Sequence, residues 1–339
     1  MFDFSSFLDL PLMWGGIIAT AIFLYVLLDG FDLGVGILFP FAPSDDCRHK
    51  MMNSVAPFWD GNETWLVLGG GGLLAAFPLA YAILLPAFYI PIILMLLGLI
   101  FRGVAFEFRF KAKKETRIVW DYSFHFGSLT ATLFQGIILG SYVEGVTVGG
   151  RSFAGGSFDW LSPFSIMTGV ALLFGYALLG STWTIMKTDH KTQEWARKVT
   201  FYVLIYVALF MGLVSLWVPF LNDQLFKRWF SLPNLVYLSP IPLLTACAFA
   251  GLYISLLKKR EVAPFILSIS LFSLGYMGLG ISLWPWIVPY KVSLWEAAAD
   301  SRSLSLMLVG VSLFLPFVLG YTVYAYYVFR GKANHQEWY

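Results

Sequence analysis

The sequence predicts an all-α membrane protein that crosses the bilayer about nine times. Of its residues, 58% are apolar, 18% are aromatic and only 12% are charged. Soluble domains carry about 25% charged residues, and a chain of this size could not bury so much apolar surface in a soluble core. Apolar segments recur along the whole chain, each near the roughly 20 residues that a helix needs to cross the hydrocarbon core. We therefore expect a single transmembrane domain.

Nine segments are candidate membrane helices. They cover residues 12–40, 53–77, 80–101, 118–146, 161–186, 199–221, 236–257, 264–286 and 303–329. Short breaks at Pro78 and at 258–264 predict tight antiparallel hairpins, and the connection 284–302 is expected to hold a short surface helix. The N-terminus lacks a basic region, so the first helix is expected to be retained rather than cleaved as a signal peptide.

The basic residues predict the orientation. Of the 22 Lys and Arg residues, only five fall in the loops that follow even-numbered segments or in the connection before the last one: Arg151, Lys227, Arg228, Lys291 and Arg302. The other 17 follow odd-numbered segments. Because cytoplasmic loops are enriched in Lys and Arg, the N-terminus is expected outside and the C-terminus in the cytoplasm.

Two pairs of acidic residues lie in or beside the first two segments. Asp29 and Asp32 belong to DGFDLGVG, and Asp60 and Glu63 belong to WDGNETW. A spacing of three residues places each pair on one helical face. Asp60 is expected about nine residues, or about 13 Å, inside the second helix from its cytoplasmic end. Since ionised groups at membrane depth are costly, such residues usually serve function or face a protein interior.

An antiparallel packing of the first two helices would bring all four acids together in the cytoplasmic half of the membrane. Gly30, Gly34, Gly36 and Gly61 would permit the close backbone approach that this needs. The acids then form either a proton relay or ion site, or a neutral hydrogen-bonded group that serves packing alone. Both readings stay open from the residues themselves.

Other residues point to no cofactor in this chain. Cys47 and Cys247 fit no metal spacing, and His125 is the only histidine inside a predicted span. A lone histidine on an apolar helix is more often a hydrogen-bonded structural residue than a haem ligand. Arg102 and Arg109 flank the end of the third segment and are expected to anchor it through local ion pairs. No metal site and no nucleic-acid partner are expected.

Three motifs, in this order, resemble subunit II of the cytochrome bd-type quinol oxidases. They are DGFDLGVG at 29–36, Asn53-Ser54 followed by WDGN at 59–62 and Trp65, and FRGVAF at 101–106. Glu63-Thr64 and the four glycines at 69–72 are similar to the cyanide-insensitive branch. The resemblance covers about the first 125 residues, and the remainder matches only in helix number and hydropathy.

The resemblance implies a fold of two four-helix bundles, at about 1–150 and 158–290, with a peripheral helix at 300–329 and a cytoplasmic tail at 330–339. It implies a bacterial inner-membrane complex that oxidises quinol, reduces dioxygen to water and generates a proton motive force. The partner, subunit I, would carry the catalytic redox centres: two b haems and haem d. Some members also hold a structural quinone or small single-helix accessory subunits, and membrane lipids would surround the complex.

The same resemblance gives Asp60 a role. The acid at this position is expected to open a proton pathway from the cytoplasm toward the haems of subunit I, with Glu63, Asp29 and Asp32 as further members. Two alternatives remain. A proton- or cation-coupled secondary transporter also uses midplane acids and glycine-broken helices, although no internal repeat is evident here. A purely structural oxidase scaffold would have no proton role.

Overall fold

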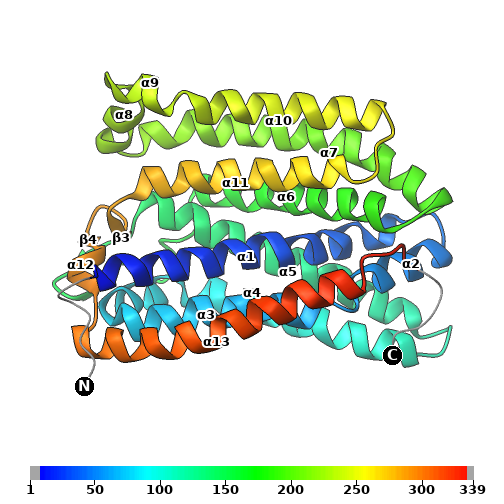
Figure 1. Cartoon of the computed structure of the whole chain (residues 1–339), viewed down its shortest axis with the longest axis horizontal. Coiled ribbons are helices and arrows are strands. Elements are labelled where there is room, and N and C mark those ends of the chain that lie inside the picture. Colours follow the sequence, from blue (N-terminus) through cyan, green and yellow to red (C-terminus); the bar gives the residue numbers. More distant parts are fainter. Residues whose placement is uncertain (1–7, 334–339) are drawn as a thin grey trace.

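The computed structural model describes residues 8–333, in which long helices lie side by side along the longest axis of the molecule (Figure 1). These helices are α1 (Leu10–Leu38), α3 (Trp59–Ala76), α4 (Pro78–Lys111), α5 (Arg117–Glu144), α6 (Pro163–Lys187), α7 (His190–Trp217), α10 (Pro240–Leu257), α11 (Ala263–Leu283) and α13 (Ser301–Val328). The shorter helices are α2 (Asp45–Val55), α8 (Asp223–Phe230), α9 (Asn234–Leu238) and α12 (Leu294–Ala297). The chain is therefore a polytopic all-α protein, as the composition predicts.

Eight helical segments are long and apolar enough to cross a membrane. Helix α3 is not among them, because its first two turns carry Asp60, Asn62 and Glu63. It nevertheless packs along α1 with one face and leaves the other face exposed. The ninth crossing and the orientation of the chain stay predictions.

Three predicted boundaries are wrong. The segment expected to begin at residue 199 begins nine residues earlier, since α7 starts at His190. The segment expected at 53–77 is two helices, since α2 ends at Val55 and α3 begins only at Trp59. The segment expected to end at residue 101 continues ten residues further, to Lys111. The prediction ended the segment at the first charged residue, because an unpaired charge is costly in a membrane. Helix α4 continues past this point because its arginines form ion pairs with carboxylates of other helices.

The connection 284–302 forms a small hairpin before its short helix. Strand β3 (Trp286–Val288) pairs antiparallel with β4 (Val292–Ser293), and α12 follows directly. Glu296 accepts a hydrogen bond from the Ser293 backbone N–H at 2.7 Å, which lowers the pKa of this carboxyl. A second hairpin joins β1 (Val148–Gly149) to β2 (Ser152–Phe153). The expected surface helix is thus only four residues long.

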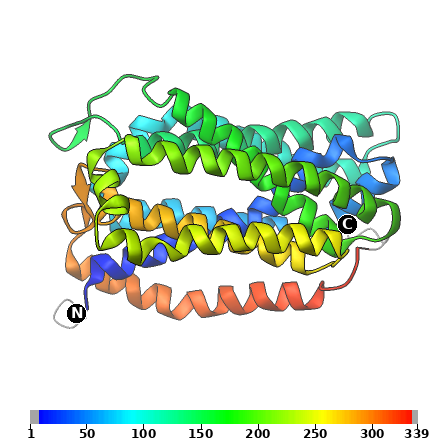
Figure 2. The same ribbon diagram turned by 90° about the horizontal axis from the view of Figure 1, so that it is seen from above.

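One apolar core runs through the middle of the molecule. It combines buried side chains from α1, α2, α4, α5, α6, α7, α10 and α11, so the two predicted bundles share a continuous interior. Helix α13 lies along one side of the molecule (Figure 2), and Figure 1 shows it at the edge opposite α10. Within α13 only Leu304, Ser305 and Leu308 are buried. Much of its apolar surface is therefore available to lipid or to another protein.

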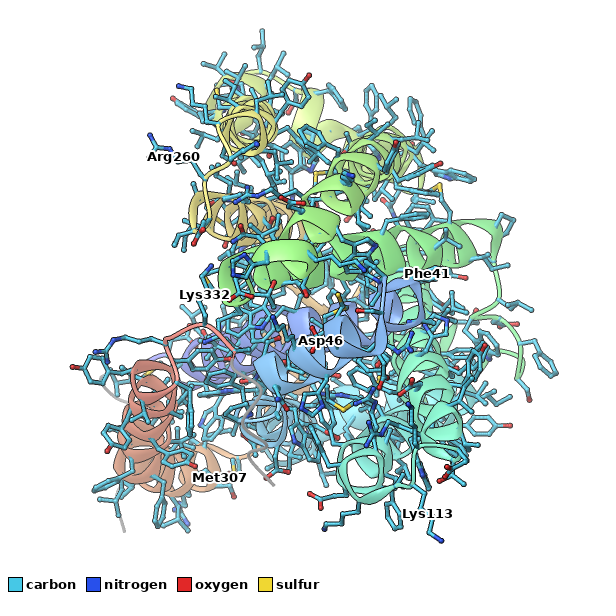
Figure 3. The ribbon with its side chains drawn as sticks, turned by 90° about the vertical axis from the view of Figure 1, so that its right-hand side faces the viewer. Phe41, Asp46, Lys113, Arg260, Met307 and Lys332 are labelled. Carbon is cyan, nitrogen blue, oxygen red and sulfur yellow. The ribbon has the colours of Figure 1, made fainter. Side chains whose placement is uncertain are left out.

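Polar contacts fasten both ends of α13. At one end, Trp14 Nε1 donates to the Leu304 carbonyl at 3.1 Å. At the other, Lys332 Nζ donates to Glu261 at 2.7 Å, and this contact lowers the pKa of the Glu261 carboxyl. Figure 3 views this second end, where Lys113, Arg260 and Lys332 lie on different segments. We call it the basic end, and the sequence predicts that it faces the cytoplasm.

Candidate functional site

The candidate site is a buried charge cluster centred on Arg102. This side chain comes from α4 and is fully buried, as are Asp29 and Asp32 of α1. Arg102 Nη2 lies 2.6 Å from Asp29 Oδ1 and 3.8 Å from Asp32 Oδ2. The two acids face the same way because they are three residues apart on one helix.

Glu63 brings a third carboxyl group from α3. Its Oε2 lies 3.6 Å from Arg102 Nη1, and its side chain is 31% exposed. One guanidinium therefore faces three carboxyl groups in a poorly hydrated interior. Because uncompensated buried charge is costly, the cluster balances its charge only when it also holds protons. This arrangement is suited to taking up and releasing protons, with Glu63 as the member nearest the surface.

Hydrogen bonds extend the cluster toward α13. Asn62 Nδ2 donates to Asp32 Oδ2 at 2.7 Å and to the Leu28 carbonyl at 3.1 Å. The Tyr326 hydroxyl in turn donates to Asn62 Oδ1 at 2.9 Å. Asn62 thus connects the acids of α1 with the otherwise loosely packed α13.

A second polar chain leads from the cluster toward α6. Tyr25 lies one turn before Asp29 on the same face of α1. Its hydroxyl accepts a hydrogen bond from Gln135 Nε2 at 2.7 Å, and the Tyr176 hydroxyl donates to Gln135 Oε1 at 2.9 Å. These side chains make a continuous polar line across α1, α5 and α6 within an apolar core.

Two aromatic rings lie beside the guanidinium of Arg102. Trp59 and Phe106 stack with centroids 4.9 Å apart, and the Arg102 guanidinium carbon lies 5.8 and 5.9 Å from their two centroids. Trp65 is also buried. The tryptophans of the WDGNETW motif thus serve packing, and Trp59 adds a cation–π contact to a charge that is withdrawn from water.

Asp60 does not join the cluster. The predicted convergence holds for Asp29, Asp32 and Glu63, whereas Asp60 is exposed in the first turn of α3. The expected depth of nine residues inside a helix is wrong, because the chain breaks between α2 and α3 just before this residue. Asp60 precedes Glu63 by one turn and lies beside it at the surface.

The predicted glycine motif does bring helices close, but not the expected pair. A Cβ on Gly30 or Gly34 would collide with Tyr176 of α6, and one on Gly36 would collide with Ser128 of α5. Gly61 faces open space. The glycines of α1 therefore let α5 and α6 approach, and α3 instead uses Gly69 and Gly72 against Ile22 and Ile18 of α1.

Sequence reasoning missed the centre of the site. Arg102 was expected to end a helix, and Asn62 was noted only as part of the WDGN motif. Tyr25, Gln135 and Tyr176 were not predicted as site residues. One signal was present: Val104, Ala105 and Phe106 continue the apolar pattern beyond Arg102. An arginine with apolar residues on both sides in a membrane helix needs an acidic partner at the same depth.

The described residues contain no cluster of metal-ligating side chains, and His125 of α5 is the histidine that lies within a predicted span. His125 lies near the Gly36 carbonyl, with Nδ1 to oxygen at 3.3 Å, and it contacts the ring of Phe41 edge-on. Within residues 8–333 no group of three His, Cys, Asp or Glu side chains could hold a metal ion. The contact with the Gly36 carbonyl orients the His125 ring, and a structural role for this residue stays a prediction. His335 lies outside the described part of the chain.

Several known proteins are similar to this chain in sequence. Residues 10–329 match the family model described as cytochrome bd terminal oxidase subunit II. The chain is 30% identical to a Bacillus subtilis protein named cytochrome bd ubiquinol oxidase subunit 2, over 96% of this chain and 97% of that one. It is 26% identical to the Escherichia coli cytochrome bd-I ubiquinol oxidase subunit 2, over 97% and 96% of the two chains.

A solved structure shows the same fold. A chain of the bd oxidase from Geobacillus thermodenitrificans superposes with a TM-score of 0.74 at 15% identity, and the match covers 95% of this chain and 97% of that one. The family match over nearly the whole chain confirms the resemblance of the three sequence motifs. The chain belongs to the cytochrome bd terminal oxidase subunit II family.

Proposed function

We propose that this chain is the non-haem subunit of a quinol oxidase that reduces dioxygen to water and generates a proton motive force. The names of the Bacillus and Escherichia relatives support quinol oxidation, and the family supports a partner, subunit I. The b and d haems, which supply the redox chemistry when bound, are expected in that partner. The same evidence favours an oxidase subunit over a secondary transporter.

The observation that supports a proton role is the excess of carboxyl groups over cations around Arg102. Three carboxyl groups share one buried cation, and one of them, Glu63, reaches the surface beside Asp60. Protons taken up at Asp60 would pass to Glu63 and then to the interior acids. We propose this order, Asp60, Glu63, then Asp29 and Asp32, as the cytoplasmic uptake path.

The exposed face of α3 supports a docking place for subunit I. Asp60, Gly70 and Gly71 are exposed there, and Val67 is 72% exposed. A carboxylate that faced lipid hydrocarbon would be costly, so this face is expected to meet protein or protein-bound water. Gly70 and Gly71 have open space around them, which permits a helix of the partner to approach closely. A bound quinone and small accessory subunits stay predictions from the resemblance.

The haem assignment has a direct test. We expect the purified two-subunit complex to show b- and d-type absorption bands, and this chain expressed alone to retain no stoichiometric haem. One histidine in a membrane helix, His125, could not serve the three haems of the complex. Difference spectra with pyridine haemochrome quantification measure both preparations. Haem retained by the lone chain and lost in His125→Ala would contradict the assignment.

The docking face has a matched pair of variants. Gly71→Leu would place a large side chain where a partner helix is expected, and we expect the yield of co-purified subunit I to fall about tenfold or more. Gly212→Leu on α7 is the control, because Gly212 is also exposed with no atom within 4 Å of an added Cβ. Equal recovery of subunit I with both variants would show that this face of α3 is not the interface with subunit I.

A further inference from the structure

A second group of charged residues surrounds a cavity that the proton path does not use. The cavity measures about 300 Å³ and lies at the basic end, where α2 meets the connection between α4 and α5. Its charged lining consists of Asp45 and Arg48 from α2, Lys114 from the connection, and Arg117 and Asp121 from α5. Arg109 of α4 lies behind these residues and is almost fully buried.

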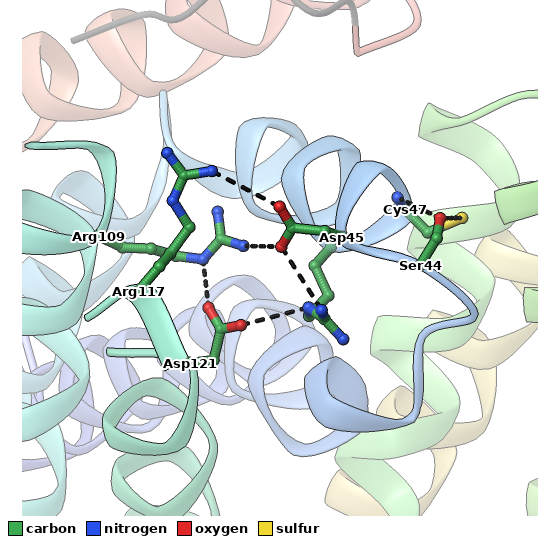
Figure 4. Close-up of polar contacts among 7 residues, drawn as sticks. Ser44, Asp45, Cys47, Arg109, Arg117 and Asp121 are labelled. Atoms are coloured by element: carbon green, nitrogen blue, oxygen red, sulfur yellow. Dashed lines mark hydrogen bonds and ion pairs between the residues drawn. The ribbon is translucent and has the colours of Figure 1, made fainter. Parts of the chain in front are cut away.

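Three arginines share two carboxylates in this group (Figure 4). Asp121 lies 2.5 Å from Arg109 Nε and 3.2 Å from Arg48 Nε. Asp45 is more loosely held, with contacts of 3.3 Å to Arg109, 3.5 Å to Arg48 and 3.6 Å to Arg117. The tight pairs fix the back of the cavity and leave Asp45 and Arg117 at its front.

The cavity keeps unmatched positive charge. Arg117 has a single ion-pair contact, at 3.6 Å, and its buried Nε has no hydrogen-bond partner in the described part of the chain. Lys114 is exposed and forms no ion pair within residues 8–333. With Arg48 and Arg109 included, four cations face two carboxylates. A metal cation is disfavoured here, whereas an anion with several oxygens would satisfy the spare N–H donors.

The mouth of the cavity is apolar on one side. Ile118 and Tyr122 line it from the first two turns of α5 and are 57% and 49% exposed. They lie at the start of a helix that is apolar enough to cross a membrane. The charged cavity therefore borders the level at which the hydrocarbon begins, which is where phospholipid phosphates lie.

We propose that this cavity binds the phosphate group of an anionic phospholipid. Arg117 and Lys114 hold the phosphate oxygens, Arg48 contributes from the far wall, and the acyl chains pass over Ile118 and Tyr122. Asp45 competes with the phosphate for the arginines, whereas Asp121 keeps Arg109 and Arg48 in place. The site would fasten a lipid to the junction of α2, α4 and α5.

The test uses the purified two-subunit oxidase in detergent and native mass spectrometry. Phosphatidylglycerol, phosphatidylcholine and inorganic phosphate are titrated separately. The double variant Lys114→Gln with Arg117→Gln should bind phosphatidylglycerol roughly 10- to 30-fold more weakly. The control Lys191→Gln with Lys258→Gln removes the same charge from exposed residues at the same end and should change binding less than about twofold.

A third variant gives the opposite sign. Asp45→Asn should tighten phosphatidylglycerol binding about fivefold, because it frees the arginines at the cavity front; a purely structural role would not do this. If inorganic phosphate displaces the lipid, the cavity binds phosphate and its ligand is a free anion. If inorganic phosphate does not displace the lipid, the result supports a phospholipid as the ligand. An equal loss of phosphatidylglycerol affinity in the cavity double variant and in the control double variant would overturn the proposal. Complete protection of Lys114 from amine reagents by subunit I would overturn it as well.

Discussion

Arg102→Met should nearly abolish the assembled oxidase. The change removes the one buried cation that Asp29, Asp32 and Glu63 share and replaces it with an apolar side chain of similar length. Leaving partners of a buried ion pair uncompensated costs about 3–5 kcal/mol, which is a large part of the stability of a typical domain. The measurement is the amount of complex, by haem content and co-purified subunits, in membranes with matched expression.

Two further variants separate charge from shape in this experiment. Arg151→Met removes an exposed arginine outside both charged sites, and we expect near-normal assembly. Adding Asp29→Asn and Glu63→Gln to Arg102→Met removes much of the stranded negative charge, so assembly should partly return. Normal assembly of Arg102→Met alone would show that the acids need no cation, and the charge-balance argument would then fail.

Asp60→Asn should preserve assembly and haem content but lower turnover at least about tenfold, the range expected when a proton-transfer group is removed. Asparagine keeps the size and hydrogen-bonding reach of the side chain and removes its titration. Because Asp60 is exposed and pairs with no described residue in this chain, its loss should not disturb the fold. Oxygen consumption per haem on matched preparations is the measurement, and Asp60→Glu should be milder.

A variant of Glu63, which belongs to the Arg102 cluster, can be compared with Asp60→Asn. Glu63→Gln should also slow turnover, because Glu63 follows Asp60 in the proposed path, but it removes an ion-pair contact as well and should lower stability modestly. A scaffold without a proton role predicts unchanged turnover per haem for both variants. Unchanged turnover in Asp60→Asn would remove this residue from the path, whatever the state of Glu63.

The sequence alone predicts the class of this protein and its family. Apolar-segment length is a local property, so α1, α5, α6 and α13 were expected within a few residues of where they lie. The acids of α1 and Glu63 also stood out locally, because ionisable residues are rare in such segments. The three motifs carried the family, which the match over residues 10–329 confirms.

Only the tertiary structure decided which of these groups meet. Arg102 and Asp29 are 73 positions apart, and no local pattern states that α4 places its guanidinium against α1. A hydropathy scale treats every arginine as an unpaired charge. The third predicted segment therefore ended at residue 101, just before Arg102. The break between α2 and α3, which turns Asp60 outward while Glu63 faces Arg102, depends on how α2 packs at the basic end. Which charged residues form ion pairs between helices depends on how the helices pack. The sequence therefore shows that these charged residues exist but does not show which of them pair.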